Sequence, residues 1–318
     1  MRDPHKNRYL LCRPEGGLND VLSEIGKCIS YGRKFGRIVI VETNSKAASH
    51  FKDVFGRYFT SQSESLILDA APFVTKFDAM EVQPQILKGF VSAYLPAVKE
   101  KLNRGQLISF DFSKDYDEEL LVHHSAGQRK GRSALAALSQ LSISQPIADE
   151  LKRRLIALGE HYHAFHVRHT DHKTDYEGRV LKLAPVVKDK IFIGTDNKAV
   201  VAFFCDVFGP DRVTSFSELP DKLGKALHYN NVGDDIWRRN RDAIVDLLIL
   251  VLADNYSFFS RLSGKRRYYS AYSGYSVLAA RLRFSQHIVR RLLPEELHGR
   301  VKSPRLAETI GNLRWRYF

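Results

Sequence analysis

The chain has 318 residues, of which 44% are hydrophobic and 27% charged. At about 150 residues per domain, this length and apolar content predict two globular domains and exclude a disordered tail. Lys and Arg number 49 against 36 Asp and Glu, so the net charge is +13 with histidine neutral. Such a surface attracts phosphates, nucleic acid or anionic lipid, and the charge alone does not choose among them.

The apolar runs, the N-terminal residues and the cysteines narrow the class of protein further. The longest apolar run, Ala243 to Ala253, is interrupted by Asp246 and is shorter than the roughly 18 to 20 residues that cross a bilayer. The first residues lack the apolar core of a signal peptide. Cys12, Cys28 and Cys205 lie far apart, which argues against a disulfide framework or a thiolate zinc site. We therefore expect a cytoplasmic protein with buried free thiols.

The N-terminal segment predicts a βαβ unit. Residues 9–12 form an apolar strand, residues 15–17 a glycine-containing turn, and Asn19 or Asp20 is a natural helix N-cap. Apolar residues then recur with helical spacing from Val21 to Ile29, before an apolar strand at 37–43. Such crossovers join parallel strands, so we expect an open α/β sheet with helices on both faces. Further strands are expected at residues 66–69, 107–110 and 120–123.

The second half repeats the alternation of strands and helices. A polar, basic loop at 125–133 and a helix at 147–158 lead into strands at 162–167, 190–194 and 212–216, with helices at 198–207 and 235–253. The prediction is two Rossmann-like domains, 1–155 and 156–318, that face each other across a cleft. The last helix of the chain is expected to pack back on the first domain. Open α/β sheets bind ligands beyond the carboxyl ends of their strands.

A histidine-rich segment at 161–175 follows and overlaps the strand at 162–167. It holds five histidines, one arginine, one lysine and two aspartates. Strand alternation places His166 and Arg168 on one face, so Arg168 emerges at the carboxyl end. There Arg168 is suited to bind a pyrophosphate and to stabilise charge on a leaving nucleotide. The alternative is that Arg168 pairs with a carboxylate while Thr170 and Asp171 cap a turn.

The same segment permits a metal site. It contains residues of the types that bind zinc or manganese, namely His166, His169, Asp171, His172 and Asp175. No HExxH or comparable spacing is present, so the prediction is no metal. A metal-dependent hydrolase that uses the cluster at His161 to Asp175 stays one alternative. A basic nucleic-acid-binding protein is another, because the C-terminal stretch from Arg290 to Phe318 is rich in arginine and aromatic residues.

Four further segments contain candidate site residues. Asp196, within Thr195-Asp196-Asn197, either caps the following helix or accepts hydrogen bonds from a nucleotide. The serine-rich segment up to Ser276 is either a phosphate cradle at a helix N-terminus or an ordinary serine cap. Gly16-Gly17 lets the backbone approach a ligand closely. Asp242 and Asp246 lie one helical turn apart, and Arg238 favours a salt-bridge ladder over a catalytic pair.

Taken in order along the chain, these motifs resemble the fucosyltransferase superfamily, which includes α1,6-fucosyltransferases, nodulation fucosyltransferases and protein O-fucosyltransferases. The resemblance rests on four segments: Gly16-Gly17-Leu18-Asn19, His166-Val-Arg168-His-Thr-Asp171, Thr195-Asp196-Asn197, and Asp246 to Ala279 with Asp254 and Ser273-Gly-Tyr-Ser276. It implies an α/β GT-B architecture and an inverting, metal-independent transfer from GDP-fucose. His169 departs from the pattern, because the α1,6 enzymes have a second arginine there.

The resemblance also implies roles for individual residues. Arg168 would clamp the donor β-phosphate, and Asp171 or Asp175 would deprotonate the acceptor hydroxyl. The donor-binding set comprises Gly16, Gly17, Asn19, His166, Arg168, His169, Thr195, Asp196, Asn197, Ser273 and Ser276. The first domain would hold the acceptor, and no cofactor beyond the nucleotide sugar is expected.

The implied function is transfer of a sugar to a glycan or lipid-linked glycan in bacterial surface polysaccharide or glycoconjugate synthesis. The positive charge and the missing span suit peripheral contact with an anionic membrane at its inner face. No nucleic-acid partner is expected.

Overall fold

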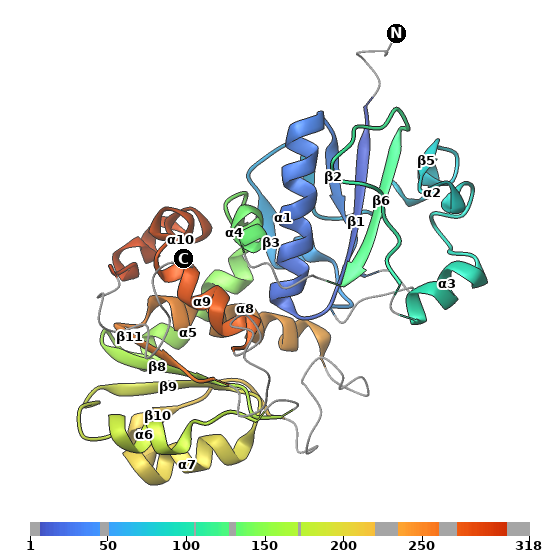
Figure 1. The fold of residues 1–318 in the computed structure, drawn as a ribbon. Coiled ribbons are helices and arrows are strands. Elements are labelled where there is room, and N and C mark those ends of the chain that lie inside the picture. Colours follow the sequence, from blue (N-terminus) through green and yellow to red (C-terminus); the bar gives the residue numbers. More distant parts are fainter. Residues whose placement is uncertain are drawn as a thin grey trace. The chain divides into compact units, whose positions relative to one another are not determined.

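The computed structural model describes residues 7–44, 51–104, 106–126, 132–170, 173–219, 235–260 and 272–303 (Figure 1). The chain divides into two compact units, Met1–Ser144 and Gln145–Phe318. The boundary expected at 155/156 falls inside helix α5 (Gln145–Leu158). This helix belongs to the second unit because it packs on α8 (Ile236–Leu252) of that unit.

The first unit is built on a five-stranded parallel sheet with strand order β4-β2-β1-β6-β5. The strands are β1 (Tyr9–Glu15), β2 (Ile38–Val41), β4 (Leu66–Ile67), β5 (Val82–Gln83) and β6 (Leu120–Ala126). A separate antiparallel pair consists of β3 (Phe59–Ser61) and β7 (Leu141–Ile143). The predicted βαβ unit is present as β1, α1 (Leu18–Phe35) and β2. The strand expected at 107–110 is reduced to a single bridge between Ile108 and His124.

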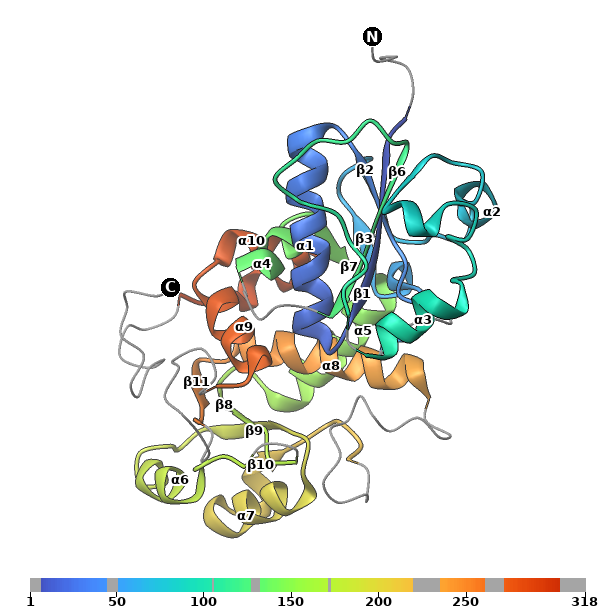
Figure 2. The same ribbon diagram turned by 45° about the vertical axis from the view of Figure 1, so that its right-hand side comes forward.

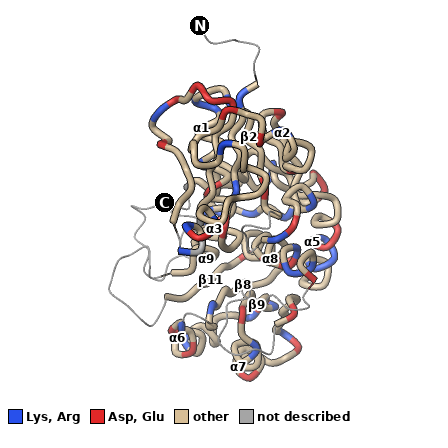
Figure 3. The backbone as a smooth tube through the Cα atoms, turned by 90° about the vertical axis from the view of Figure 1, so that its right-hand side faces the viewer, with Lys and Arg blue, Asp and Glu red and all other residues tan. Residues whose placement is uncertain are grey.

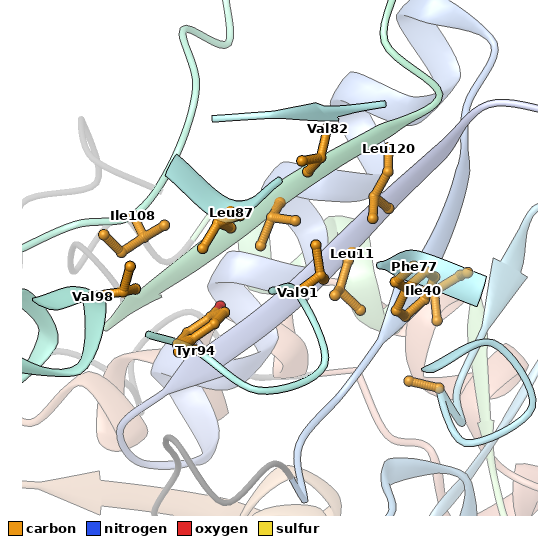
Figure 4. Packing of buried hydrophobic residues seen from close by; sticks show 12 residues of the cluster. Leu11, Ile40, Phe77, Val82, Leu87, Val91, Tyr94, Val98, Ile108 and Leu120 are labelled. Carbon is orange, nitrogen blue, oxygen red and sulfur yellow. The ribbon is translucent and has the colours of Figure 1, made fainter. Parts of the chain in front are cut away.

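Helices cover both faces of this first sheet. Helix α1 packs on β1, β2 and β6, and α4 (Arg132–Leu138) packs on α1. On the other face, Leu11, Ile40 and Leu120 meet side chains from the segment that contains α2 (Val74–Phe77) and α3 (Pro96–Asn103) (Figure 4). Because side chains alternate along a strand, Leu10 and Cys12 point toward α1. Cys12 and Cys28 are buried free thiols as expected, whereas Cys205 is only half-buried.

The second unit has a four-stranded sheet of order β10-β9-β8-β11, with every neighbouring pair parallel. Its strands are β8 (Tyr162–Val167), β9 (Lys190–Thr195), β10 (Val213–Thr214) and β11 (Asn255–Phe258). Helices α6 (Glu177–Leu183) and α7 (Lys198–Phe208) lie on one face, with α5 and α8 on the other (Figure 2). Helices α9 (Gly274–Arg283) and α10 (Gln286–Leu292) follow β11. The packing of the chain's last helix on the first domain stays a prediction, since residues 304–318 lie outside the described part.

Basic and acidic positions are interspersed along the described chain in both units (Figure 3). Among the described helices, none is both long enough and apolar enough to cross a membrane.

Gly26 is essential for the close packing of α1 against α4. A Cβ atom at Gly26 would lie 1.7 Å from the backbone oxygen of Ser133. We expect Gly26→Ala to lower the free energy of unfolding by about 3 kcal/mol, because helix backbones must separate to admit the methyl group. Gly178 of α6 has no atom within 4 Å of its would-be Cβ, so Gly178→Ala is the matched control. Urea unfolding of both variants checks this, and equal stability of the two would contradict it.

Candidate functional site

The candidate site lies at the carboxyl edge of the second sheet. From β8 the chain runs outward to β9 and β10 and then returns to β11 on the other side of β8. The strand order therefore reverses between β8 and β11, which is where open α/β sheets bind ligands. The predicted segments that follow β8 and β9 both begin at this edge, because these strands are parallel neighbours.

His166 and Ser276 are brought together at this edge. The two residues are 110 positions apart, and His166 Nδ1 lies 2.6 Å from Ser276 Oγ. Ser276 is almost fully buried, and the Tyr256 hydroxyl donates to its carbonyl oxygen at 3.2 Å. Burial, reinforced by the nearby charge of Arg168, lowers the pKa of His166 to about 3. His166 is therefore a neutral hydrogen-bonding side chain with a fixed ring.

Asp196 fixes the loop that carries Arg168. Its Oδ1 accepts from the backbone N–H of His169 at 2.7 Å, and its Oδ2 accepts from the Thr170 hydroxyl at 2.6 Å. Asn197 adds a third tie, since its Nδ2 donates to the His169 carbonyl at 3.1 Å. The backbone directly after Arg168 is thus clamped to the end of β9. Arg168 itself is partly exposed, as a side chain that meets a ligand must be.

The helix cap after β9 is Asn197 and not Asp196. Asn197 Oδ1 accepts from the backbone N–H of Ala199 at 2.9 Å. The backbone N–H of Asn197 in turn donates to the Thr195 hydroxyl at 3.3 Å. Asp196 therefore does not cap this helix. Its carboxylate instead holds the loop after β8.

His169 closes the same loop on itself. Its Nδ1 accepts from the backbone N–H of Thr174 at 3.3 Å, and its ring meets the ring of Tyr176 edge-on with centroids 5.1 Å apart. Burial, followed by the charge of Lys173, lowers the pKa of His169. A neutral imidazole accepts a hydrogen bond from a backbone N–H and so holds the loop closed. An arginine at this position could not do so, because a guanidinium has no acceptor.

Ser273 supplies an unsatisfied hydroxyl beside the start of α9. It is the N-cap residue and is 6% exposed, yet its side chain makes no cap hydrogen bond. Its Oγ is buried and has no hydrogen-bond partner among the described residues. The first amides of a helix also lack intrahelical partners and favour an anion. Ser273 is therefore not an ordinary serine cap. The other interpretation of this segment, a phosphate cradle, stays a prediction.

The two expected bases have different positions. Asp175 is at the surface, with its side chain 54% exposed and an oxygen 3.9 Å from Arg179 Nε. Its backbone N–H donates to the Ser260 carbonyl at 3.1 Å, just past β11. Asp171 and His172 lie outside the described residues. Within the described chain, no group of three or more His, Cys, Asp or Glu residues could hold a metal ion.

The remaining predicted residues belong to the first unit. Gly16 has φ +99°, which favours glycine, and Gly17 is the N-cap of α1. Asn19 is 8% exposed, and its Oδ1 is buried without a partner among the described residues. The structure places these three together at the carboxyl end of β1. Their part in donor binding stays a prediction.

Two α/β units with parallel sheets flanked by helices define the fold class predicted from sequence, that of GT-B-like proteins. The cleft expected between the two domains stays a prediction. No protein-family model and no curated protein sequence matches the chain.

The chain is similar in structure to fucosyltransferases over most of its length. One is the NodZ α1,6-fucosyltransferase soaked with GDP-fucose, with a TM-score of 0.56 at 14% identity over 86% of this chain and 92% of that one. Fucosyltransferase NodZ from Bradyrhizobium gives 0.53 at 16% identity over 79% and 88%. POFUT1 in complex with GDP-fucose gives 0.53 at 12% identity over 98% and 99%. At this identity the comparisons establish the fold.

Proposed function

We propose that the protein is an inverting, metal-independent glycosyltransferase that transfers fucose from GDP-fucose to a hydroxyl of a glycan. The observation that carries the proposal is the convergence at one sheet edge of Arg168, the His166–Ser276 pair and the hydroxyl of Ser273, which has no hydrogen-bond partner in the described part of the chain. The fold adds support, because the similar structures of NodZ and POFUT1 were obtained with GDP-fucose.

Each residue of the edge has a part in this proposal. Arg168 donates to the β-phosphate and stabilises the charge that develops as the nucleoside diphosphate leaves. Ser273 and the first amides of α9 donate to the same phosphates. His166, held by Ser276, presents its remaining ring nitrogen to the donor. Asp196 and Asn197 are positioning residues, because they act through the backbone of His169 and Thr170.

The attacking hydroxyl must also lose a proton, and the carboxylates predicted for that step are Asp171 and Asp175.

The proposal extends to the acceptor and to the location of the protein. The first unit holds a glycan or lipid-linked glycan acceptor, and the pathway is bacterial surface polysaccharide or glycoconjugate synthesis. The protein is cytoplasmic, and its net positive charge favours contact with anionic lipid. Sedimentation with vesicles of anionic lipid, against vesicles of neutral lipid, tests that contact.

Calorimetric titration with GDP, GDP-fucose, UDP and CMP, with and without EDTA, tests the donor site. We expect binding of the two guanine nucleotides, no effect of EDTA, and a 10- to 100-fold weaker affinity, or about 1.5 to 3 kcal/mol, for Arg168→Ala. Arg153→Ala is the matched control, since Arg153 is an exposed arginine of α5 that pairs with Glu150.

Binding of UDP or CMP alone would agree with a glycosyltransferase but contradict GDP-fucose as its donor. A wild-type protein that binds none of the four nucleotides would contradict the proposed function.

A further inference from the structure

A continuous surface lies at the amino edge of the sheet in the second unit, where the parallel strands begin. Lys190, the first residue of β9, donates from its Nζ to the Ala157 carbonyl of α5 at 3.2 Å. Arg212, directly before β10, donates from its Nη2 to the carbonyls of Val187 and Asp189 at 2.8 and 2.9 Å. These contacts join the end of α5, the segment between α6 and β9, and the start of β10.

Two aliphatic side chains protrude from this surface. Ile156 of α5 is 69% exposed and Val186, shortly after α6, is 70% exposed, which are the largest exposed fractions among the large hydrophobic residues described. Each is next in sequence to a residue whose carbonyl accepts from a basic side chain, namely Ala157 and Val187. Single exposed aliphatic residues are ordinary on a protein surface. Here two of them lie on one surface together with cations.

Further basic side chains lie beside the two aliphatic ones. Lys152 is exposed one helical turn before Ile156, and Lys188 is exposed between the two residues whose carbonyls bind Arg212. The surface thus combines apolar and cationic side chains. We call it the amino-edge patch and define it by Lys152, Ile156, Val186, Lys188, Lys190 and Arg212.

The charge at this edge is positive. Just past the end of α5, Arg300 and Lys302 donate to the carbonyls of Gly159 and Glu160 at 2.8 and 2.9 Å. The end of a helix favours cations, and a carbonyl holds a cation without cancelling its charge. Among the described residues, the carboxylates at this edge are Glu160, Asp189, Asp211 and Asp254, of which Asp254 pairs with Lys302 at 2.5 Å. The basic side chains of the described edge outnumber these carboxylates.

This combination of side chains suits the surface of an anionic membrane. Lipid phosphates attract the lysines, and the boundary between head groups and acyl chains takes up aliphatic side chains. A nucleic acid would engage the same cations, but it would leave Ile156 and Val186 in water. The exposed aliphatic pair therefore favours lipid over nucleic acid.

We propose that the amino-edge patch is the surface through which the protein contacts anionic lipid. The inference rests on the membrane contact in the proposed function and assigns that contact to named residues. The candidate site lies at the opposite, carboxyl edge of the same sheet. Lipid at the amino edge leaves the candidate site open to a nucleotide sugar from solution, so we expect vesicles to leave the calorimetric affinity for GDP-fucose unchanged.

Sedimentation with vesicles of equal parts phosphatidylglycerol and phosphatidylcholine, against vesicles of phosphatidylcholine alone, tests the charges of the patch. For the double variant Lys188→Gln/Lys190→Gln we expect about 30-fold weaker binding to the anionic vesicles, because two attractions to the anionic surface are lost. Lys99→Gln/Lys101→Gln is the matched control, since it makes the same charge change at exposed positions of α3 in the first unit.

A second double variant tests the aliphatic side chains. For Ile156→Ser/Val186→Ser we expect about 10-fold weaker binding to the anionic vesicles, because less apolar surface leaves water. This loss should persist at high salt, which screens the lysines but not the apolar contact. Ile86→Ser/Leu107→Ser is the matched control, because Ile86 and Leu107 are exposed aliphatic residues of the first unit.

The outcomes separate the inference from the proposed function. Wild-type affinity for the anionic vesicles in both patch variants would overturn the inference and leave the transferase untouched. Weaker binding of the lysine variant alone would show a site for polyanions without apolar contact, which also contradicts the inference. Wild-type protein that does not bind anionic vesicles would overturn the membrane contact together with the patch. Protein that binds the vesicles through the patch but binds no nucleotide would contradict the transferase alone.

Discussion

Replacing Arg154 by methionine is expected to lower the free energy of unfolding by about 3 to 5 kcal/mol. Arg154 extends from α5, and its side chain is 1% exposed. Its Nη1 lies 2.7 Å from Asp246 Oδ1, its Nη2 binds Asp242, and its Nε lies 2.6 Å from Glu150 Oε1. Methionine fills part of the volume, but it removes the buried guanidinium that both carboxylates share. Asp242 keeps the partly exposed Arg241 at 2.9 Å, whereas Asp246 keeps the neutral Ser217 hydroxyl at 2.6 Å.

The control for this prediction is the adjacent arginine. Arg153 also pairs with Glu150, at 2.8 Å, but its side chain is 62% exposed. Exposed ion pairs contribute little, so we expect Arg153→Met to change the free energy of unfolding by less than about 1 kcal/mol. Urea unfolding of both variants provides the comparison. Adding Asp246→Asn to Arg154→Met should recover part of the loss, since it removes one unpaired charge. An Arg154→Met protein as stable as Arg153→Met would contradict the argument.

The same residues show a limit of sequence interpretation. Asp242 and Asp246 lie one turn apart on α8, and the local pattern predicted a ladder with Arg238. That prediction is wrong, because Arg238 pairs with Glu218 at 2.7 Å while both aspartates bind Arg154. Arg154 is 92 positions from Asp246, and helical periodicity reports only neighbours on the same helix. Residues on facing helices cannot be matched from spacing alone.

The fold was predictable where apolar residues follow the period of their element. Strand β1, helix α1 and strand β2 are examples, since each contains buried aliphatic residues at the spacing of its element. Strand β11 was not predicted, because its four residues, Asn-Tyr-Ser-Phe, are half polar and short. The boundary between the units was placed too late for a different reason. The amphipathic pattern of α5 shows that the helix packs, but not on which sheet.

The candidate site was predictable to the extent that polar residues gather at strand ends. The segments after β8 and β9 were found in this way, and parallel pairing brings Asp196 to His169 and Thr170. The bond between His166 and Ser276 depends instead on where α9 begins. In the first unit, the hydrogen bond between Glu15 and His124 gave no local signal, because Glu15 lies in a predicted turn and His124 follows the predicted strand at 120–123. Their 109-residue separation closes only when β1 and β6 pair.

Acid is expected to destabilise the second unit through its buried histidines. Burial, with a smaller effect of Arg283, lowers the pKa of His163 to about 4, and the pKa of His166 is lowered to about 3. Above pH 6.5 both histidines are neutral in the folded and the unfolded chain, so neither changes stability. As the pH falls below 6.5, the unfolded chain takes up protons that the folded chain cannot, and the free energy of unfolding falls.

For His163 the expected loss at pH 5 is about 2 kcal/mol relative to pH 7. The His163→Gln variant should therefore show a shallower decline of the free energy of unfolding between pH 6.5 and 4 than the wild type. It gives up the stacking of His163 on Phe165, whose ring centroids are 4.3 Å apart, and that loss applies at every pH. The difference in slope between His163→Gln and the wild type therefore reports the protonation of His163. His287→Gln, at an exposed position of α10, should leave the slope unchanged, and parallel curves for His163→Gln and the wild type would show that His163 titrates alike in both states.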